Sequence, residues 1–317
     1  MTSPLVSVII PTRNRPQSLA TAVQSALEQS YDAIEVRIVD DGSEPPAVLP
    51  PFLAADERVH MTRLETSVGP AQARNIAVEN SGGEFLAFLD DDDEWQPDKT
   101  MRQVDAMLAA GDDVAGVQCG WEFVEDRGVV FTFVPDAKRD LPRVLLERPT
   151  MAPSSVLLRR SAFEAAGGFD PSLPRMEDWD LWLRIADRHD FALLPDVLLR
   201  RRGHPGRIVA AEELPAFLSM RARLQPRLDA LPIAERQRLE LAHNLTLARL
   251  YARTRQRRRA LSTLARAWRA APRARAVYTT GFVLFVVETP MWRVGRRVRL
   301  RMRRAQPAPS TPPVRSW

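Results

Sequence analysis

The stretch GEFLAFLDDDDEWQPDK, residues 83–99, decides the fold. Its apolar run at 85–89 predicts a buried strand, and four consecutive aspartates follow at 90–93. Because side chains alternate along a strand, Asp90 and Asp92 are expected on the same face. There they can hold one divalent metal, which in turn can hold a diphosphate. The other interpretation is a solvated acidic turn before the helix that Pro97 opens.

Strands and helices alternate through the N-terminal half of the chain. Short apolar runs predict strands at 6–10, 36–39, 59–64 and 85–89, and amphipathic segments predict helices at 16–27, 69–80 and 97–109. This alternation predicts right-handed crossovers and an α/β fold with a doubly wound, mostly parallel sheet. Such sheets bind ligands at the carboxyl ends of their strands, where Thr12, Asp41 and the aspartates fall.

The pattern changes after residue 110. Strand-like runs at 114–122 and 129–135 are expected to pair as a hairpin, followed by a strand at 154–158 and a short helix at 161–166. A helix that starts at Glu177 precedes strands at 191–194 and 197–199. The domain boundary is expected near Arg207.

Charge is distributed unevenly along the 317 residues, whose formal net charge is +5. Residues 1–200 contain 19 Lys and Arg against 34 Asp and Glu, whereas residues 201–317 contain 26 against 6. This asymmetry predicts contact between the basic part and an anionic surface. The single cysteine, Cys119, excludes a disulfide framework, and the first residues do not show the basic and then apolar segments of a signal peptide. A reducing, cytoplasmic location is therefore expected.

The C-terminal part is predicted to be helical over 212–272. One segment matches the offsets of a tetratricopeptide repeat, through Leu247, Ala248, Tyr251, Ala260, Leu264, Ala267 and Pro272. A lone repeat cannot build a solenoid, so we expect a helical hairpin that packs on the N-terminal domain, on a second copy or on a partner protein.

The end of the chain combines an apolar stretch at 276–287 with seven arginines between Arg293 and Arg304. A membrane-spanning helix needs roughly 20 apolar residues, so a helix lying in the inner membrane interface is expected instead. The arginines alternate with apolar residues rather than exposed aromatics, which argues against nucleic acid. The predicted organisation is a domain over 1–207, a helical region over 208–275, a basic membrane-associating segment over 276–305 and a disordered tail over 306–317.

Five motifs occur together in this sequence. They are SVIIPTRNRP (7–16), VDDGS (39–43), GPAQARN (69–75), FLDDDDEWQP (88–97) and EDWDLWLR (177–184). Each motif alone is weak, but in this order and spacing the chain resembles the family 2 glycosyltransferases over about residues 5–205. The resemblance implies the GT-A fold, a nucleotide-sugar donor, a divalent metal such as Mn²⁺ or Mg²⁺, and inversion at the anomeric carbon.

The resemblance also implies roles on the donor side. Thr12 and Asp41 resemble the family's uracil and ribose contacts, with Arg13 and Asp40 in the same pocket. Arg74 and Asn75 resemble positions near the ribose and diphosphate. Without the resemblance, a strand-end turn would explain VDDGS and a surface position would explain Arg74.

The remaining roles concern the metal and the acceptor. Asp90 and Asp92 match the ends of the family's DxD signature, Asp92 as the direct ligand and Asp90 near the ribose; Asp91, also on the donor side, stands where the family often has Ser. Asp178 matches the catalytic base, which takes the acceptor's hydroxyl proton opposite the leaving diphosphate. Residues Glu177 and Trp179 are expected on the acceptor side, and His204 is a further candidate for the metal shell. Otherwise Asp178 is a helix N-terminal carboxylate, and Trp179 and Trp182 are core aromatics.

Three other functions fit parts of the pattern. A sugar nucleotidyltransferase needs a glycine-rich basic loop after the first strand, but the loop here, PTRNRP, contains no glycine. A receiver-like module needs a lysine on a late strand, and the chain's two lysines, Lys99 and Lys138, are not placed there. A catalytically degenerate nucleotide-sugar-binding or scaffold protein of the same fold stays open. The preferred hypothesis is an inverting transferase that adds a sugar, from a UDP-sugar, to a glycan or lipid-linked acceptor in surface polysaccharide synthesis.

Overall fold

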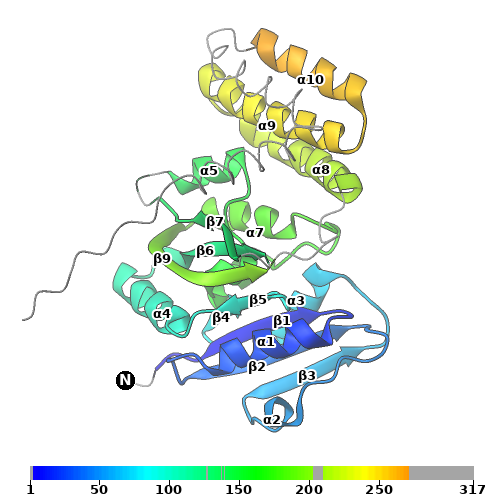
Figure 1. Cartoon of the computed structure of the whole chain (residues 1–317). Coiled ribbons are helices and arrows are strands. Elements are labelled where there is room, and N and C mark those ends of the chain that lie inside the picture. Colours follow the sequence, from blue (N-terminus) through cyan, green and yellow to red (C-terminus); the bar gives the residue numbers. More distant parts are fainter. Residues whose placement is uncertain (1–2, 126–127, 137, 139, 203–209, 271–317) are drawn as a thin grey trace, which may run out of the picture. The chain divides into compact units, whose positions relative to one another are not determined.

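The computed structural model describes residues 3–125, 128–136, 138, 140–202 and 210–270 (Figure 1). His204 and the segments predicted at 276–305 and 306–317 therefore lie outside the described residues. The chain divides after Leu231 into two compact units, each of which is described by itself.

A nine-stranded mixed sheet forms the centre of the first unit. Its strands follow the order β3-β2-β1-β4-β8-β6-β9-β5, and β7 pairs with β6 beside this path. Neighbours from β3 to β4 are parallel, as are β6 and β9, whereas the pairs β4–β8, β8–β6, β5–β9 and β6–β7 are antiparallel. The bounds are β1 Val6–Thr12, β2 Ile34–Asp41, β3 Val59–Leu64, β4 Phe85–Phe88, β5 Asp93–Trp95, β6 Val114–Glu125, β7 Gly128–Phe133, β8 Val156–Arg159 and β9 Asp190–Arg202.

Helices cover both faces of this sheet, as alternation along the buried strands requires. Val8 and Ile10 belong to a core shared with α1 and α4, whereas Phe88 packs on Phe163, Phe169 and Trp182 in an aromatic cluster. Figure 1 shows α1 lying along β1 and β2. The helices of the first unit are α1 Pro16–Leu27, α2 Pro51–Ala54, α3 Pro70–Glu79, α4 Lys99–Ala110, α5 Leu141–Glu147, α6 Arg160–Ala165, α7 Glu177–Ala186 and α8 Ala210–Asp229.

The predicted α/β fold and the hairpin of β6 with β7 are confirmed, while two strands differ from the prediction. The strand expected from residue 154 starts at Val156, because Pro153–Ser155 form a 3₁₀ turn. The two strands predicted at 191–194 and 197–199 are one strand, β9. Pro195 cannot donate to the ladder, and the β6–β9 register shifts beside it, between Gln118 and Gly120.

The aspartates at 90–93 do not extend a strand. Asp90 and Asp92 do lie together, as expected, but a turn brings them together rather than strand alternation. Strand β4 ends at Phe88, and the backbone N–H of Asp93 donates to the carbonyl of Asp90 over 3.0 Å, which closes a turn. The short strand β5, not predicted, starts at Asp93. Helix α4 begins at Lys99, two residues after the predicted Pro97.

The first unit also continues past the boundary predicted near Arg207. Helix α8 belongs to it: the Phe217 ring stacks on Trp179 at 6.2 Å between centroids. Arg223 bonds Asp170 over 2.8 Å, and Arg227 bonds Asp187 over 2.7 Å. These three contacts attach α8 to the sheet domain.

The second unit contains a helical hairpin among its described residues. Helices α9, Ile233–Arg253, and α10, Arg257–Ala270, pack together and bury Leu247, Ala248, Ala260 and Ala267. The resemblance of this hairpin to a tetratricopeptide repeat stays a prediction. Among the described residues, no helix combines the length and the apolar character needed to cross a membrane.

Candidate active site

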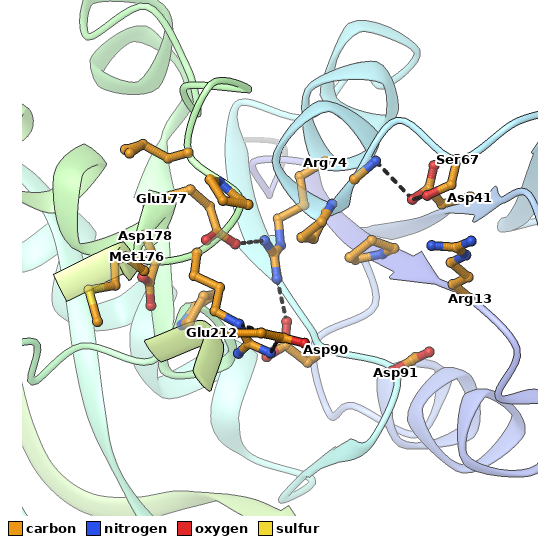
Figure 2. A pocket seen from close by; sticks show the side chains of 18 of the residues that line it. Arg13, Asp41, Ser67, Arg74, Asp90, Asp91, Met176, Glu177, Asp178 and Glu212 are labelled. Carbon is orange, nitrogen blue, oxygen red and sulfur yellow. Dashed lines mark hydrogen bonds and ion pairs between the residues drawn. The ribbon is translucent and has the colours of Figure 1, made fainter. Parts of the chain in front are cut away.

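A cavity of about 1060 Å³ opens at the carboxyl ends of the central strands of the first unit. Its walls come from the loop after β1, the ends of β2 and β4, the start of α7, and α8. In Figure 2, Asp41, Ser67 and Arg13 lie on one side, Asp178 and Met176 on the other, and Arg74 between them. The predicted site residues that line it are Thr12, Arg13, Asp41, Arg74, Asp90, Asp91, Asp92, Glu177 and Asp178.

Asp41 fixes one wall of the cavity through three hydrogen bonds. Its carboxylate accepts from the Ser67 hydroxyl over 2.7 Å and from the backbone N–H groups of Val68 and Gly69 over 2.6 and 3.0 Å. Gly69 has a φ of 87°, in the left-handed region that favours glycine, and directly precedes α3. The side chain predicted to contact the nucleotide therefore also holds the loop that leads into α3.

Two residues assigned to the donor side do not line the cavity. Asp40 is fully buried, and its carboxylate accepts from the N–H groups of Ser43 and Ala47 over 2.9 and 3.0 Å. The side chain of Asn75 exchanges two hydrogen bonds with the backbone of Phe169. Both placements correct the prediction, because these polar groups satisfy the backbone of turns rather than facing a ligand.

The aspartate turn presents its carboxylates in two directions. Asp91 accepts from the Thr12 hydroxyl over 2.8 Å and from Nη1 of Arg15 over 3.0 Å, and burial raises the pKa of its carboxyl. Asp90, Asp92 and Asp93 each offer an oxygen, and these three oxygens lie within 4.8 Å of one another. Three carboxylate oxygens so close are a suitable donor set for Mg²⁺ or Mn²⁺.

Asp93 is a member of this set that the sequence analysis did not assign. The hydroxyl of Ser154 donates to its carboxylate over 2.7 Å, and the same hydroxyl accepts from the N–H of Asp90 over 3.0 Å. Ser154 therefore clamps both ends of the turn. The run of four aspartates could have indicated Asp93 as a metal ligand. It was not assigned because strand alternation, assumed over residues 90–93, selected Asp90 and Asp92.

Arg74 connects the aspartate turn to α7. Its side chain is only 6% exposed, and its guanidinium bonds Asp90 over 2.6 Å and Glu177 over 2.8 Å. The guanidinium also lies 5.3 Å from the centroid of the Phe169 ring. The two carboxylates raise the pKa of Arg74 against the effect of burial, so the cation persists in this buried position.

Asp178 stands in the first turn of α7, next to Glu177. Its carboxylate accepts from the N–H of Trp179 over 2.7 Å. Burial raises the pKa of Asp178 to about 7, with the neighbouring Glu177 charge as a further cause. The residue before the helix, Met176, has a φ of 63°, an uncommon conformation for a non-glycine residue. A carboxyl group with a pKa near neutrality, on a constrained helix start, can exchange a proton at physiological pH.

Trp179 does not face the cavity, which corrects its assignment to the acceptor side. It is 1% exposed, and its indole N–H donates to the carbonyl of Leu145 over 2.6 Å. Trp182 is likewise buried and donates to Met151 over 3.0 Å. Both rings are core aromatics with satisfied N–H groups.

Several cavity-lining residues were not predicted from the sequence, among them Arg15 and part of α8. Arg15 lines the cavity and bonds the aspartate turn; the PTRNRP motif contained it, but only Arg13 was assigned. Helix α8 supplies Glu212, Pro215, Ala216 and Ser219, and no local pattern marked these residues as part of a site.

Comparison with known proteins identifies this arrangement. The sequence model described as Glycosyl transferase family 2 matches residues 7–167, half of the chain. The chain belongs to glycosyltransferase family 2, and it has the fold and the strand-end cavity expected of that family.

Individual relatives agree with this assignment. WfgD of Escherichia coli, named as a UDP-Glc:α-D-GlcNAc-diphosphoundecaprenol β-1,3-glucosyltransferase, is 29% identical over 181 residues, 57% of this chain and 69% of that one. The chain spans between about a third and two thirds of the length of the uncharacterised rickettsial glycosyltransferases that it also matches.

Solved structures share the fold. The mannosyltransferase PcManGT of Pyrobaculum calidifontis, in complex with GDP-Man and Mn²⁺, aligns with a TM-score of 0.58 at 22% identity, over 91% of this chain and 82% of that one. Residues 1–349 of S. aureus TarS, in complex with UDP-GlcNAc, align with a TM-score of 0.56 at 20% identity, over 78% of this chain and 72% of that one. These neighbours show a GT-A-like fold.

Proposed function

We propose that the chain is a metal-dependent, inverting glycosyltransferase that moves a sugar from a nucleotide-sugar donor to a hydroxyl of a glycan or lipid-linked acceptor. One observation carries this proposal: a single cavity is lined by Thr12 and Asp41, by the aspartate turn and by Asp178. A donor lying along the cavity would have its nucleotide by Asp41 and its reacting sugar between the aspartate turn and Asp178. This order of groups suits a single displacement, in which base and leaving group act on opposite sides of the sugar.

The residues suit the roles that such a reaction requires. Asp178 would accept the proton of the acceptor hydroxyl as the bond to the anomeric carbon forms, while the bond to the diphosphate breaks. Asp90, Asp92 and Asp93 would hold the divalent ion; when bound, it neutralises charge on the departing nucleoside diphosphate. Arg74 would keep Asp90 and Glu177 at a fixed separation on the two sides of the reacting sugar.

A UDP-sugar and a lipid-linked acceptor are the proposed substrates. Asp41 can accept a hydrogen bond from the imide of uracil, and WfgD is named for a UDP-Glc donor and a diphosphoundecaprenol-linked acceptor. We further propose that the basic C-terminal part holds the enzyme at the cytoplasmic face of an anionic membrane, where such acceptors reside. Cosedimentation with anionic vesicles, compared with neutral vesicles, tests this location.

Calorimetric titration of the purified chain with UDP, GDP and dTDP, in Mn²⁺ and then in EDTA, tests the donor part of the proposal. We expect metal-dependent binding of UDP that Asp92→Ala abolishes. Failure to bind any of the three nucleotides would contradict the proposal and favour a scaffold protein of the same fold.

The pKa of Asp178 predicts how transfer depends on pH. A base must be ionised to accept a proton, and the carboxyl of Asp178 ionises as the pH rises through about 7. We therefore expect kcat/KM to rise about tenfold per pH unit below this value and to level off above it. Initial rates measured across this range at saturating metal check the prediction; a profile flat from acid to neutral pH would contradict it.

Helix α8 is proposed as the acceptor wall in place of Trp179. Ala216 is 7% exposed and lines the cavity together with Pro215, Ser219 and Met176, the residue before α7. We expect Ala216→Trp to fill this part of the cavity, reducing sugar transfer at least about tenfold while slow hydrolysis of the donor continues. Comparing transfer with hydrolysis in Ala216→Trp and in the exposed-site control Leu218→Trp checks this. Equal loss of both reactions would place α8 on the donor side instead.

A further inference from the structure

We propose that Arg15 is a donor-binding residue. While the donor is absent, its guanidinium bonds Asp91 and Asp92 of the aspartate turn; when metal and donor bind, it leaves these aspartates and bonds the donor diphosphate instead. The inference rests on the proposed function, because it concerns the same cavity and the same nucleotide-sugar.

The backbone of Arg15 is fixed where β1 passes into α1. Its carbonyl accepts from the N–H of Leu19 over 3.0 Å and from the hydroxyl of Ser18 over 3.3 Å, and Pro16 follows as the first residue of the helix. The side chain is 41% exposed and lines the cavity. A long side chain on a rigid base can change its partner without moving the backbone.

One nitrogen of this side chain serves two buried carboxylates. Nη1 of Arg15 donates to Asp92 over 2.8 Å and to Asp91 over 3.0 Å, and the side chains of these aspartates are 0% and 7% exposed. Within the described part of the chain, Nε and Nη2 of Arg15 make no hydrogen bond. The guanidinium thus bonds the turn through the two N–H groups of Nη1 and keeps the N–H groups of Nε and Nη2 available for oxygens that enter the cavity.

Asp92 takes part in two arrangements that compete electrostatically. It holds Arg15, and it is also one of the three aspartates whose oxygens lie within 4.8 Å of one another. A divalent cation bound there would stand close to the guanidinium, and like charges in a partly buried site repel strongly. A donor diphosphate resolves this conflict, because it supplies anionic oxygens to both cations, and the planar fork of arginine suits phosphate well.

Arg13 provides a matched control. It lines the same cavity from the same loop, and within the described residues it makes no hydrogen bond or ion pair with an aspartate of the turn. Substituting Arg13 therefore removes an equal charge from the cavity without releasing Asp91 or Asp92.

The test is calorimetric titration of the full chain with Mn²⁺ alone, at one fixed pH for all variants, and then with UDP in saturating Mn²⁺. We expect Arg15→Gln to bind Mn²⁺ about tenfold more tightly than the wild type and UDP about tenfold more weakly, since one repulsion and one phosphate contact are lost. Arg13→Gln should keep its Mn²⁺ affinity within about twofold, and Arg15→Lys, which keeps the charge, should show little gain.

Unchanged or weaker Mn²⁺ binding in Arg15→Gln would overturn the proposal, as would an equal gain in Arg13→Gln. Tighter Mn²⁺ binding with unchanged UDP affinity would overturn the diphosphate contact. Adding Asp92→Asn to the Arg15→Gln variant should abolish the gain in Mn²⁺ affinity. That result would show that the additional Mn²⁺ affinity arises at the aspartate turn. Mn²⁺ binding needs neither a donor nor an acceptor. The Mn²⁺ affinities of the variants can therefore be compared even if the chain transfers no sugar, a finding that would contradict the proposed function alone.

Discussion

Asp178→Asn is expected to lower the rate of sugar transfer about 10²–10⁴-fold, which is the usual contribution of a positioned general base. Asparagine has nearly the same shape as aspartate and can still accept the hydrogen bond from the N–H of Trp179, so the start of α7 should keep its structure. Its amide cannot take up a proton at neutral pH. We therefore expect kcat to fall while the affinity for the donor nucleotide stays near that of the wild type.

The experiment compares transfer rates and UDP affinities in Asp178→Asn and in a control on the same helix, Asp180→Asn. Asp180 bonds Arg184 over 2.8 Å and Arg223 over 3.5 Å and does not line the cavity, so its substitution should leave the rate within a few-fold of wild type. Retention of transfer in Asp178→Asn would remove this residue from the chemical step. Equal losses in both variants would indicate a general effect on α7.

Arg74→Met should cost about 3–5 kcal/mol in the free energy of unfolding of the first unit, because removing one partner of a buried ion pair strands the other. Here two carboxylates, Asp90 and Glu177, would lose their shared cation. Methionine fills much of the same volume, so the loss should reflect charge rather than a cavity. Transfer should disappear as well, since the aspartate turn and α7 would no longer be tied together.

Urea denaturation followed by tryptophan fluorescence measures this effect, since Trp95, Trp179 and Trp182 are buried in the first unit. Arg175→Met is the matched control: Arg175 bonds Glu212 over 2.5 Å, but its side chain is 34% exposed and Glu212 is 57% exposed. Exposed pairs contribute about 0–1 kcal/mol, so this variant should unfold almost as the wild type does. A similar cost for both arginines would show that burial does not set the strength of the Arg74 pairs.

Local patterns predicted most of the sheet and helices of the first unit. Buried parallel strands leave continuous apolar runs, which is why β1, β2 and β4 were found. The sequence offered a turn at residues 90–93 only as a solvated alternative. That the turn is buried could not be predicted, because its geometry depends on the hydroxyl of Ser154, a residue far along the chain. Short elements such as α2 and α5 left too little periodicity to be recognised.

Motifs led to residues that line the cavity, whose roles stay predictions, whereas tertiary packing decides which other residues face it. Asp41, Arg74 and Asp178 line the cavity as expected. Asp40 and Trp179 are residue types common in binding sites. However, the Asp40 carboxylate accepts from the N–H of Ser43, and the Trp179 indole N–H donates to the carbonyl of Leu145. Nothing in a single sequence shows which of two adjacent aspartates faces a cavity. Helix α8 could not be foreseen as a wall, since its position depends on side-chain contacts with α7.

The attachment of α8 has a practical consequence for dividing this chain. The helix lies beyond residues 7–167, which the family shares, yet Phe217, Arg223 and Arg227 fasten it to the sheet domain. A fragment that ends near Arg207 would lose one side of the cavity and uncover the Trp179 ring, so it should aggregate. A fragment that ends at Leu231 keeps this attachment. If α8 forms the proposed acceptor wall, exchanging it between relatives, together with the residues that anchor it, should alter acceptor preference in the hybrid.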